Sequence, residues 1–202
     1  MIGRSLGGAI AVDFAASFPH MVKSLVLLAP AGLIRPYRYH FGWVSRFVVS
    51  GAISDRLFEW TVARRLRRGP SRPNVAKTGD EKGYRDETAA LVESRLDITM
   101  TTVAQWQLDY HEGFVRSFAS SIRHSSLEER QETWRKLGER ADKVLIIGGS
   151  SDSIIVAEEL REDAIEAIGE EKVVWRVVEG GHDFPNTRWE EVMEELCDFW
   201  GL

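Results

Sequence analysis

Apolar side chains recur at helical spacing near the start of the chain, and this periodicity predicts a helix over residues 6–17. The Phe18-Pro19 pair ends the pattern, because the residue before a proline disfavours the helical conformation. Residues 24–28 then form a short, continuous apolar run that is followed by Ala-Pro-Ala-Gly. A run without alternation is typical of a strand covered on both faces, so the pattern predicts a central parallel sheet.

The same order of strand, loop and helix returns near the C-terminus. Apolar residues 144–147 lead into a Gly- and Ser-rich loop, and a helix is predicted over about 157–168. Residues 173–178 predict a further strand, after which a last helix begins with Thr187 and Glu190 at the spacing of a capping box. We expect this last helix to bury one stripe of side chains, made of Trp189, Val192, Met193, Leu196 and Trp200.

Residues 33–141 have a different pattern from the two ends of the chain. They form helical segments rich in Trp, Phe and Arg, interrupted by the polar stretch 69–83, and predict an inserted helical cap. Trp106, Tyr110 and Phe114 recur every fourth residue. This spacing predicts a helix stripe that packs on the rest of the chain, and a contact with substrate is the alternative.

Composition and charge narrow the class of protein. With 202 residues, 44% of them hydrophobic, the chain can bury one sizeable core. The 26 Lys and Arg against 31 Asp and Glu give a net charge of -5, which predicts no general attraction to nucleic acid or anionic lipid. We interpret the arginine cluster at 64–68 as a solvated helix face. Cys197 is the only cysteine, which excludes an internal disulfide and a cysteine-rich zinc site.

The first residues imitate a secretory signal, because Arg4 is followed by a small and apolar run. Asp13 interrupts that run, and no other stretch is long and apolar enough to cross a membrane. We therefore expect a soluble, cytoplasmic protein without a membrane span.

Residues 3–8 read Gly-Arg-Ser-Leu-Gly-Gly and match the G-x-S-x-G nucleophile elbow, a sharp turn from strand to helix that holds a serine above a sheet. The missing side chains of Gly3 and Gly7 are expected to let the turn tighten and the helix press on the strand. The start of the helix directs backbone amides towards Ser5, and the Leu6 N–H is the expected oxyanion donor. Glycine and serine are common, so the pattern gains weight only from its context.

A serine hydroxyl needs a base to become a good nucleophile, and a histidine base needs an acid that orients it. Asp152 follows the predicted strand at 144–147, and His182 follows the next one. Open parallel sheets bind ligands at the carboxyl ends of their strands, which favours these two residues as acid and base over a turn cap and a structural histidine. Asp183 is interpreted as a local hydrogen-bonding neighbour.

The elbow, followed in order by Asp152 and His182, resembles the α/β-hydrolase superfamily over nearly the whole chain. The inserted helices and the segment 113–118 resemble its cap-bearing esterases, lipases and carbon–carbon bond hydrolases. A serine at the nucleophile position is unlike its epoxide hydrolases and haloalkane dehalogenases, which use aspartate. The resemblance implies an α/β fold with parallel strands flanked by helices: 1–32 with the elbow, helix and following strand, 33–141 with the helical cap and a return helix, and 142–202 with the acid and the histidine.

The resemblance implies a serine hydrolase that acts on a carboxylic ester or related acyl substrate through an acyl-enzyme. Ser5 would be the nucleophile, His182 the base and Asp152 the acid. The aromatic cap favours an apolar small-molecule substrate, and no metal or organic cofactor is implied. The alternatives are an acyltransferase or carbon–carbon bond hydrolase of the same superfamily, and a catalytically inactive fragment or binding module.

Only Met1 and Ile2 precede the elbow, whereas the resemblance implies several strands and helices before it. We therefore expect an N-terminally truncated chain that lacks the loop donating the second oxyanion N–H. The strand at 24–28 would then be left as an exposed apolar edge. The sequence makes no prediction of the oligomeric state.

Overall fold

The computed structural model describes residues 1–35, 53–68, 90–92, 94–124 and 130–202. The chain divides into two compact units. The first consists of Met1–Ile34 with Ser126–Leu202, and the second of Arg35–Ser125. None of the helices in these described ranges is both long and apolar enough to cross a bilayer.

A four-stranded parallel sheet forms the centre of the first unit, as the apolar runs predict. Its spatial order is β1-β2-β5-β6, with strands at Ile2–Arg4, Leu25–Leu28, Val144–Gly149 and Val173–Val178. Every residue of β2 and β5 is buried, as expected for strands covered on both faces. Because all four strands are parallel, the loops that follow β1, β5 and β6 leave the same edge of the sheet.

The strand at 24–28 is not the edge of the sheet, so that prediction was wrong. Ile2, Gly3 and Arg4 pair in parallel with residues 26–28, which places β2 between β1 and β5. The three residues before Ser5 are thus enough to form a ladder against β2. The outer strands of this four-stranded sheet are β1 and β6.

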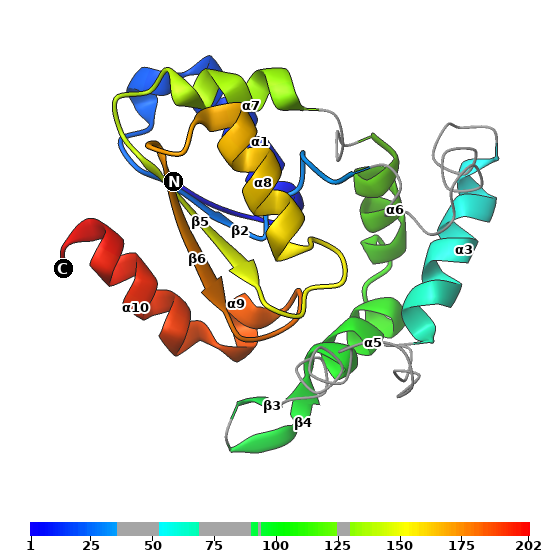
Figure 1. The fold of residues 1–202 in the computed structure, drawn as a ribbon. Coiled ribbons are helices and arrows are strands. Elements are labelled where there is room, and N and C mark those ends of the chain that lie inside the picture. The colour runs from blue at the N-terminus through cyan, green and yellow to red at the C-terminus, as the bar shows by residue number, and fades with distance from the viewer. Residues whose placement is uncertain (36–52, 69–89, 93, 125–129) are drawn as a thin grey trace. The chain divides into compact units, whose positions relative to one another are not determined.

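Helices cover the sheet in Figure 1, with α1 (Leu6–Ser17), α7 (Gln131–Gly138) and α8 (Ala157–Ile168) on one face and α10 (Trp189–Trp200) on the other. The predicted helices at 6–17 and 157–168 have these bounds in the structure. Helix α7 contacts both α1 and α8, and its Trp134 and Leu137 are completely buried in the core of the first unit.

The last helix differs from its prediction in two ways. Only Val192 and Leu196 of the expected stripe are buried, whereas Trp189, Met193 and Trp200 are 40–59% exposed. The predicted capping box is absent, because Thr187 belongs to the short helix α9 (Phe184–Thr187) and donates its hydroxyl to the Asp183 carbonyl. Arg188, without a side-chain cap, precedes α10.

The second unit contains helices and a small antiparallel hairpin, so it is not entirely helical. The hairpin pairs β3 (Ala90–Val92) with β4 (Arg95–Thr99). Within its described residues the helices are α3 (Asp55–Arg67), α5 (Met100–Tyr110) and α6 (Phe114–His124). The predicted polar stretch 69–83 lies outside the described residues.

The expected stripe of aromatic residues spans two helices. Trp106 and Tyr110 lie on α5, with 56% and 74% of their surface exposed, whereas Phe114 begins α6. Gly113 lies between the two helices and is a breaker that the every-fourth-residue spacing did not take into account.

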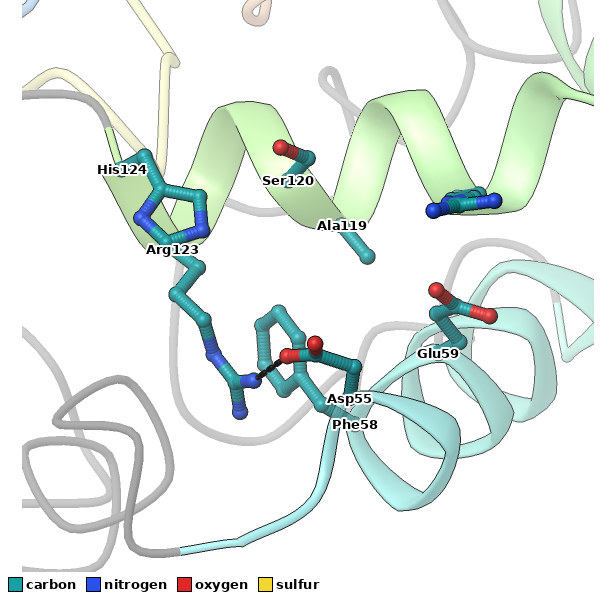
Figure 2. Close-up of a pocket in the computed structure, with 8 residues that line it drawn as sticks. Asp55, Phe58, Glu59, Ala119, Ser120, Arg123 and His124 are labelled. Atoms are coloured by element: carbon teal, nitrogen blue, oxygen red, sulfur yellow. Dashed lines mark hydrogen bonds and ion pairs between the residues drawn. The ribbon is translucent and has the colours of Figure 1, made fainter.

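Helices α3 and α6 pack around a small core of their own, formed by Phe58, Val62 and Ala119. Figure 2 shows the pocket between these helices, where the Arg123 guanidinium lies 4.4 Å from the centre of the Phe58 ring and forms an ion pair with Asp55. The arginines of the cluster at 64–68 lie in the last turn of α3 and at its C-cap, and all are exposed, as predicted for a solvated face; the Arg67 side chain is 54% exposed.

Candidate active site

Ser5 lies in the turn between β1 and α1 and has a strained backbone, with φ 50° and ψ -123°. Such angles are rare for a residue with a side chain and persist only where neighbouring contacts enforce them. The Ser5 amide donates to the Leu28 carbonyl at 3.0 Å, and the Ser5 carbonyl accepts from the amides of Gly8 and Ala31, each at 2.9 Å. Three backbone hydrogen bonds therefore hold the turn in this conformation.

Close packing at the elbow depends on Gly3 and Gly8. A Cβ at Gly3 would lie 2.6 Å from the Gly7 carbonyl oxygen, and one at Gly8 would lie 2.5 Å from the Cβ of Pro30. A Cβ at Gly7 would meet no atom within 4 Å, so the space around it does not impose the steric requirement expected there. A side chain at Gly7 would face open space, whereas one at Gly8 would face Pro30 in the segment that follows β2.

Asp152 lies in the loop after β5 and is buried, with 5% of its surface exposed. Its Oδ1 accepts the backbone amides of Ile154 and Ile155, both at 2.8 Å. Its Oδ2 lies 2.7 Å from His182 Nδ1. The backbone thus fixes one carboxylate oxygen and leaves the other directed at the imidazole.

His182 lies in the loop after β6 and connects the other two predicted residues. Its Nε2 is 3.0 Å from the Ser5 hydroxyl oxygen, while its Nδ1 faces Asp152. A carboxylate at Nδ1 favours the tautomer with the proton on that nitrogen, which leaves the Nε2 lone pair to accept from the serine hydroxyl. The structure therefore brings Ser5, His182 and Asp152 into one continuous chain of hydrogen bonds.

The acid loop and the histidine loop are joined by backbone contacts. The Ser150 amide donates to the Val178 carbonyl and the Ser151 amide to the Gly180 carbonyl, both at 2.9 Å. A Cβ at Gly149 would lie only 2.7 Å from the Gly180 carbonyl oxygen. A glycine at the end of β5 thus allows the loop of Asp152 and the loop of His182 to approach each other closely.

Arg4 has a role at this site that the sequence analysis missed. Its Nη2 donates to the His182 carbonyl at 3.1 Å and to Asp183 Oδ1 at 2.5 Å. Asp183 was expected to be a local neighbour, yet its carboxylate pairs with a residue 179 positions earlier in the chain. The sequence contained one indication of this pair, because Arg4 is adjacent to Ser5 and Asp183 is adjacent to His182.

The Leu6 amide, which the sequence predicts as an oxyanion donor, lies at the start of a helix. Leu6 is the first residue of α1, so its amide is among those that have no acceptor within the helix. Helix N-termini favour anions, which suits an oxyanion next to Ser5. Within the described ranges, His, Cys, Asp and Glu side chains form no group of three or more that could hold a metal ion.

Comparison with known proteins gives the same fold. A family model described as the alpha/beta hydrolase fold matches residues 1–185. A search of curated proteins found no match. Among solved structures, a bromoperoxidase from Bacillus anthracis is 18% identical, with a TM-score of 0.61 over 100% of this chain and 66% of that one.

Two other similar structures have different activities in their names. The 2-hydroxy-6-oxo-6-phenylhexa-2,4-dienoate hydrolase of Rhodococcus sp. strain RHA1 is 14% identical, with a TM-score of 0.58 over 100% of this chain and 63% of that one. A thermophilic esterase from Thermogutta terrifontis is 19% identical, with a TM-score of 0.56 over 98% and 63%.

The chain spans slightly less than two thirds of the length of these three structures. At identities of 14–19% they show a shared fold. The parallel sheet, the strained serine turn and the family match over residues 1–185 show that this chain belongs to the alpha/beta hydrolase fold family.

Proposed function

We propose that this chain is a serine hydrolase that cleaves a carboxylic ester or related acyl substrate through Ser5, His182 and Asp152. The observation that carries the proposal is the chain of hydrogen bonds from Ser5 Oγ to His182 Nε2 at 3.0 Å and from His182 Nδ1 to Asp152 Oδ2 at 2.7 Å. A buried acid, an oriented histidine and a serine within reach are the groups that acyl transfer requires.

In the proposed reaction, Ser5 Oγ attacks the carbonyl carbon while His182 Nε2 accepts the hydroxyl proton. Asp152 stabilises the imidazolium, and the Leu6 N–H donates to the oxyanion of the tetrahedral intermediate. His182 then protonates the departing alcohol, which leaves an acyl ester on Ser5. Water attacks that ester, gives a proton to His182, and the collapse of the second intermediate returns the proton to Ser5 Oγ and releases the carboxylic acid.

An ester is the first choice of substrate because its alcohol leaving group needs only the proton that His182 supplies. The resemblance in fold to the Thermogutta terrifontis esterase supports this choice. The exposed aromatic side chains of α5 support an apolar substrate, and the role of the second unit as a cap is part of the proposal.

The test compares residues 1–202 with the Ser5→Ala variant, using a fluorophosphonate probe and p-nitrophenyl esters of increasing chain length. We expect one covalent adduct on Ser5 and a loss of about 10⁴-fold or more in ester hydrolysis in the variant. Ser17→Ala is the matched control, because Ser17 is an exposed serine at the other end of α1. Equal hydrolysis by the wild type and Ser5→Ala would refute the proposal.

A carbon–carbon bond hydrolase is the second candidate, supported by the structural similarity to the Rhodococcus enzyme. Product analysis with an ester and with a vinylogous diketone would distinguish the two, because only the second substrate requires a carbon leaving group. An added alcohol acceptor in the same assay would reveal acyl transfer. A folded chain that leaves every probe unreacted would instead fit a non-catalytic binding module.

A further inference from the structure

Two side-chain connections join the nucleophile turn to the histidine loop. One is the hydrogen bond between Ser5 Oγ and His182 Nε2. The other runs from Arg4 to the His182 carbonyl and to the Asp183 carboxylate. Because β1 and β6 are the outer strands in the order β1-β2-β5-β6, no ladder of backbone hydrogen bonds links the strand before Ser5 directly to the strand before His182.

The first connection cannot hold the loop throughout a reaction cycle. Once Ser5 Oγ is bonded to an acyl carbon it has no hydroxyl proton to donate, and His182 must remain in place to activate water. The second connection takes no part in proton transfer. The planar fork of the Arg4 guanidinium has a fixed geometry and donates to acceptors that lie outside the reacting groups.

The position of Asp183 supports a role for this ion pair. Asp183 is the N-cap residue of α9, where aspartate side chains commonly accept a helix amide, yet it makes no side-chain cap hydrogen bond. Its carboxylate instead lies 2.5 Å from Arg4 Nη2. The side chains of Arg4 and Asp183 are 32% and 19% exposed, so solvent screens this pair less than a fully exposed one.

We propose that Arg4 and Asp183 are positioning residues that clamp the loop bearing His182 onto the strand that precedes the nucleophile. The clamp keeps the imidazole within reach of Ser5 after the hydroxyl proton has left. This inference rests on the proposed function. It adds a contact between the elbow and the histidine loop that depends on Arg4. The G-x-S-x-G pattern allows any residue at this position.

The test compares Arg4→Gln, Arg4→Lys, Asp183→Asn and the Arg4→Gln/Asp183→Asn double variant. Arg176→Gln is the matched control, because it removes an arginine ion pair of the same unit, with Glu195 at 2.7 Å, that does not touch His182. We expect Arg4→Gln to lower kcat for p-nitrophenyl acetate by about tenfold or more, since small displacements of a reacting group are costly. KM should not rise, because neither residue is expected to contact substrate and slower deacylation lowers KM together with kcat.

The conservative and double variants distinguish a clamp from a general loss of structure. Arg4→Lys should recover part of the rate, because an ammonium can pair with Asp183 but cannot reproduce the guanidinium fork. The double variant should be no slower than the slower single variant, as expected for two residues of one interaction. If Arg4→Gln does not fold, Asp183→Asn breaks the same ion pair from the other side.

Hydrogen exchange of residues 180–184 gives a readout that does not depend on activity. The amides of this loop should exchange faster in Arg4→Gln and Asp183→Asn than in the wild type or Arg176→Gln. Unchanged exchange together with rates within twofold of the wild type would overturn the clamp, even if Ser5 is labelled normally. If the wild type is never labelled, the proposed function fails and the exchange comparison alone decides the clamp.

Discussion

Some residues of the candidate site lie in recognisable local sequence patterns, whereas others meet only through contacts between distant loops. The sequence predicts residues of the first kind and not those of the second. Ser5 has a glycine-rich motif around it, and Asp152 and His182 each follow an apolar run, so all three could be proposed from the sequence. The pairing of Arg4 with Asp183 could not, because it depends on how two loops of the fold approach each other.

The adjacent glycines Gly7 and Gly8 of the elbow are expected to differ in how well they tolerate a side chain. Gly8→Ala should lower the free energy of unfolding by about 1–3 kcal/mol, because the new methyl group would overlap the Pro30 ring. Gly7→Ala should leave stability unchanged or raise it by up to about 1 kcal/mol, because the space is open and alanine favours a helix. Urea unfolding of both variants measures the difference. Equal destabilisation by the two would contradict this account of the turn.

Elements were predicted best where periodicity and burial agree. The bounds of α1 and α8 follow from a helical pattern with a clear stop, and β2 and β5 follow from continuous apolar runs. The start of α10 was predicted wrongly, because a favourable Thr-to-Glu spacing also occurs across the end of α9. Local spacing alone does not show which of two adjacent helices a residue joins.

Strand β5 is the element on which the site depends most, since β2 and β6 pair with its two sides. Ile146 lies in β5 and is completely buried, so Ile146→Ala should cost about 2–5 kcal/mol through lost burial and a cavity. Ile154→Ala is the control, because Ile154 is 54% exposed, and it should change stability by less than about 1 kcal/mol. Chemical unfolding followed by tryptophan fluorescence provides the measurement. A similar loss in both variants would show that burial in β5 is not what stabilises the first unit.

At the scale of the molecule, the buried apolar residues that the structure describes form two separate clusters. The large cluster lies around the parallel sheet, and a smaller one joins α3 to α6. The change in composition along the sequence led us to expect an inserted helical region, and it did not predict the hairpin of β3 and β4. The hairpin was missed because its two strands are only 3 and 5 residues long, too short for a clear alternating pattern.

The strained backbone of Ser5 is expected to lower the stability of the whole molecule at the position where the proposed reaction needs a serine. A residue with a side chain at φ 50° and ψ -123° costs roughly 1–3 kcal/mol, whereas glycine adopts such angles readily. Ser5→Gly should therefore raise the melting temperature while removing the nucleophile, and Ser5→Ala, which keeps the Cβ, should not. Differential scanning calorimetry of the two variants would test this, and a lower melting temperature for Ser5→Gly would contradict it. If the expectation holds, the chain gives up some stability to place at this turn the serine that the proposed reaction needs.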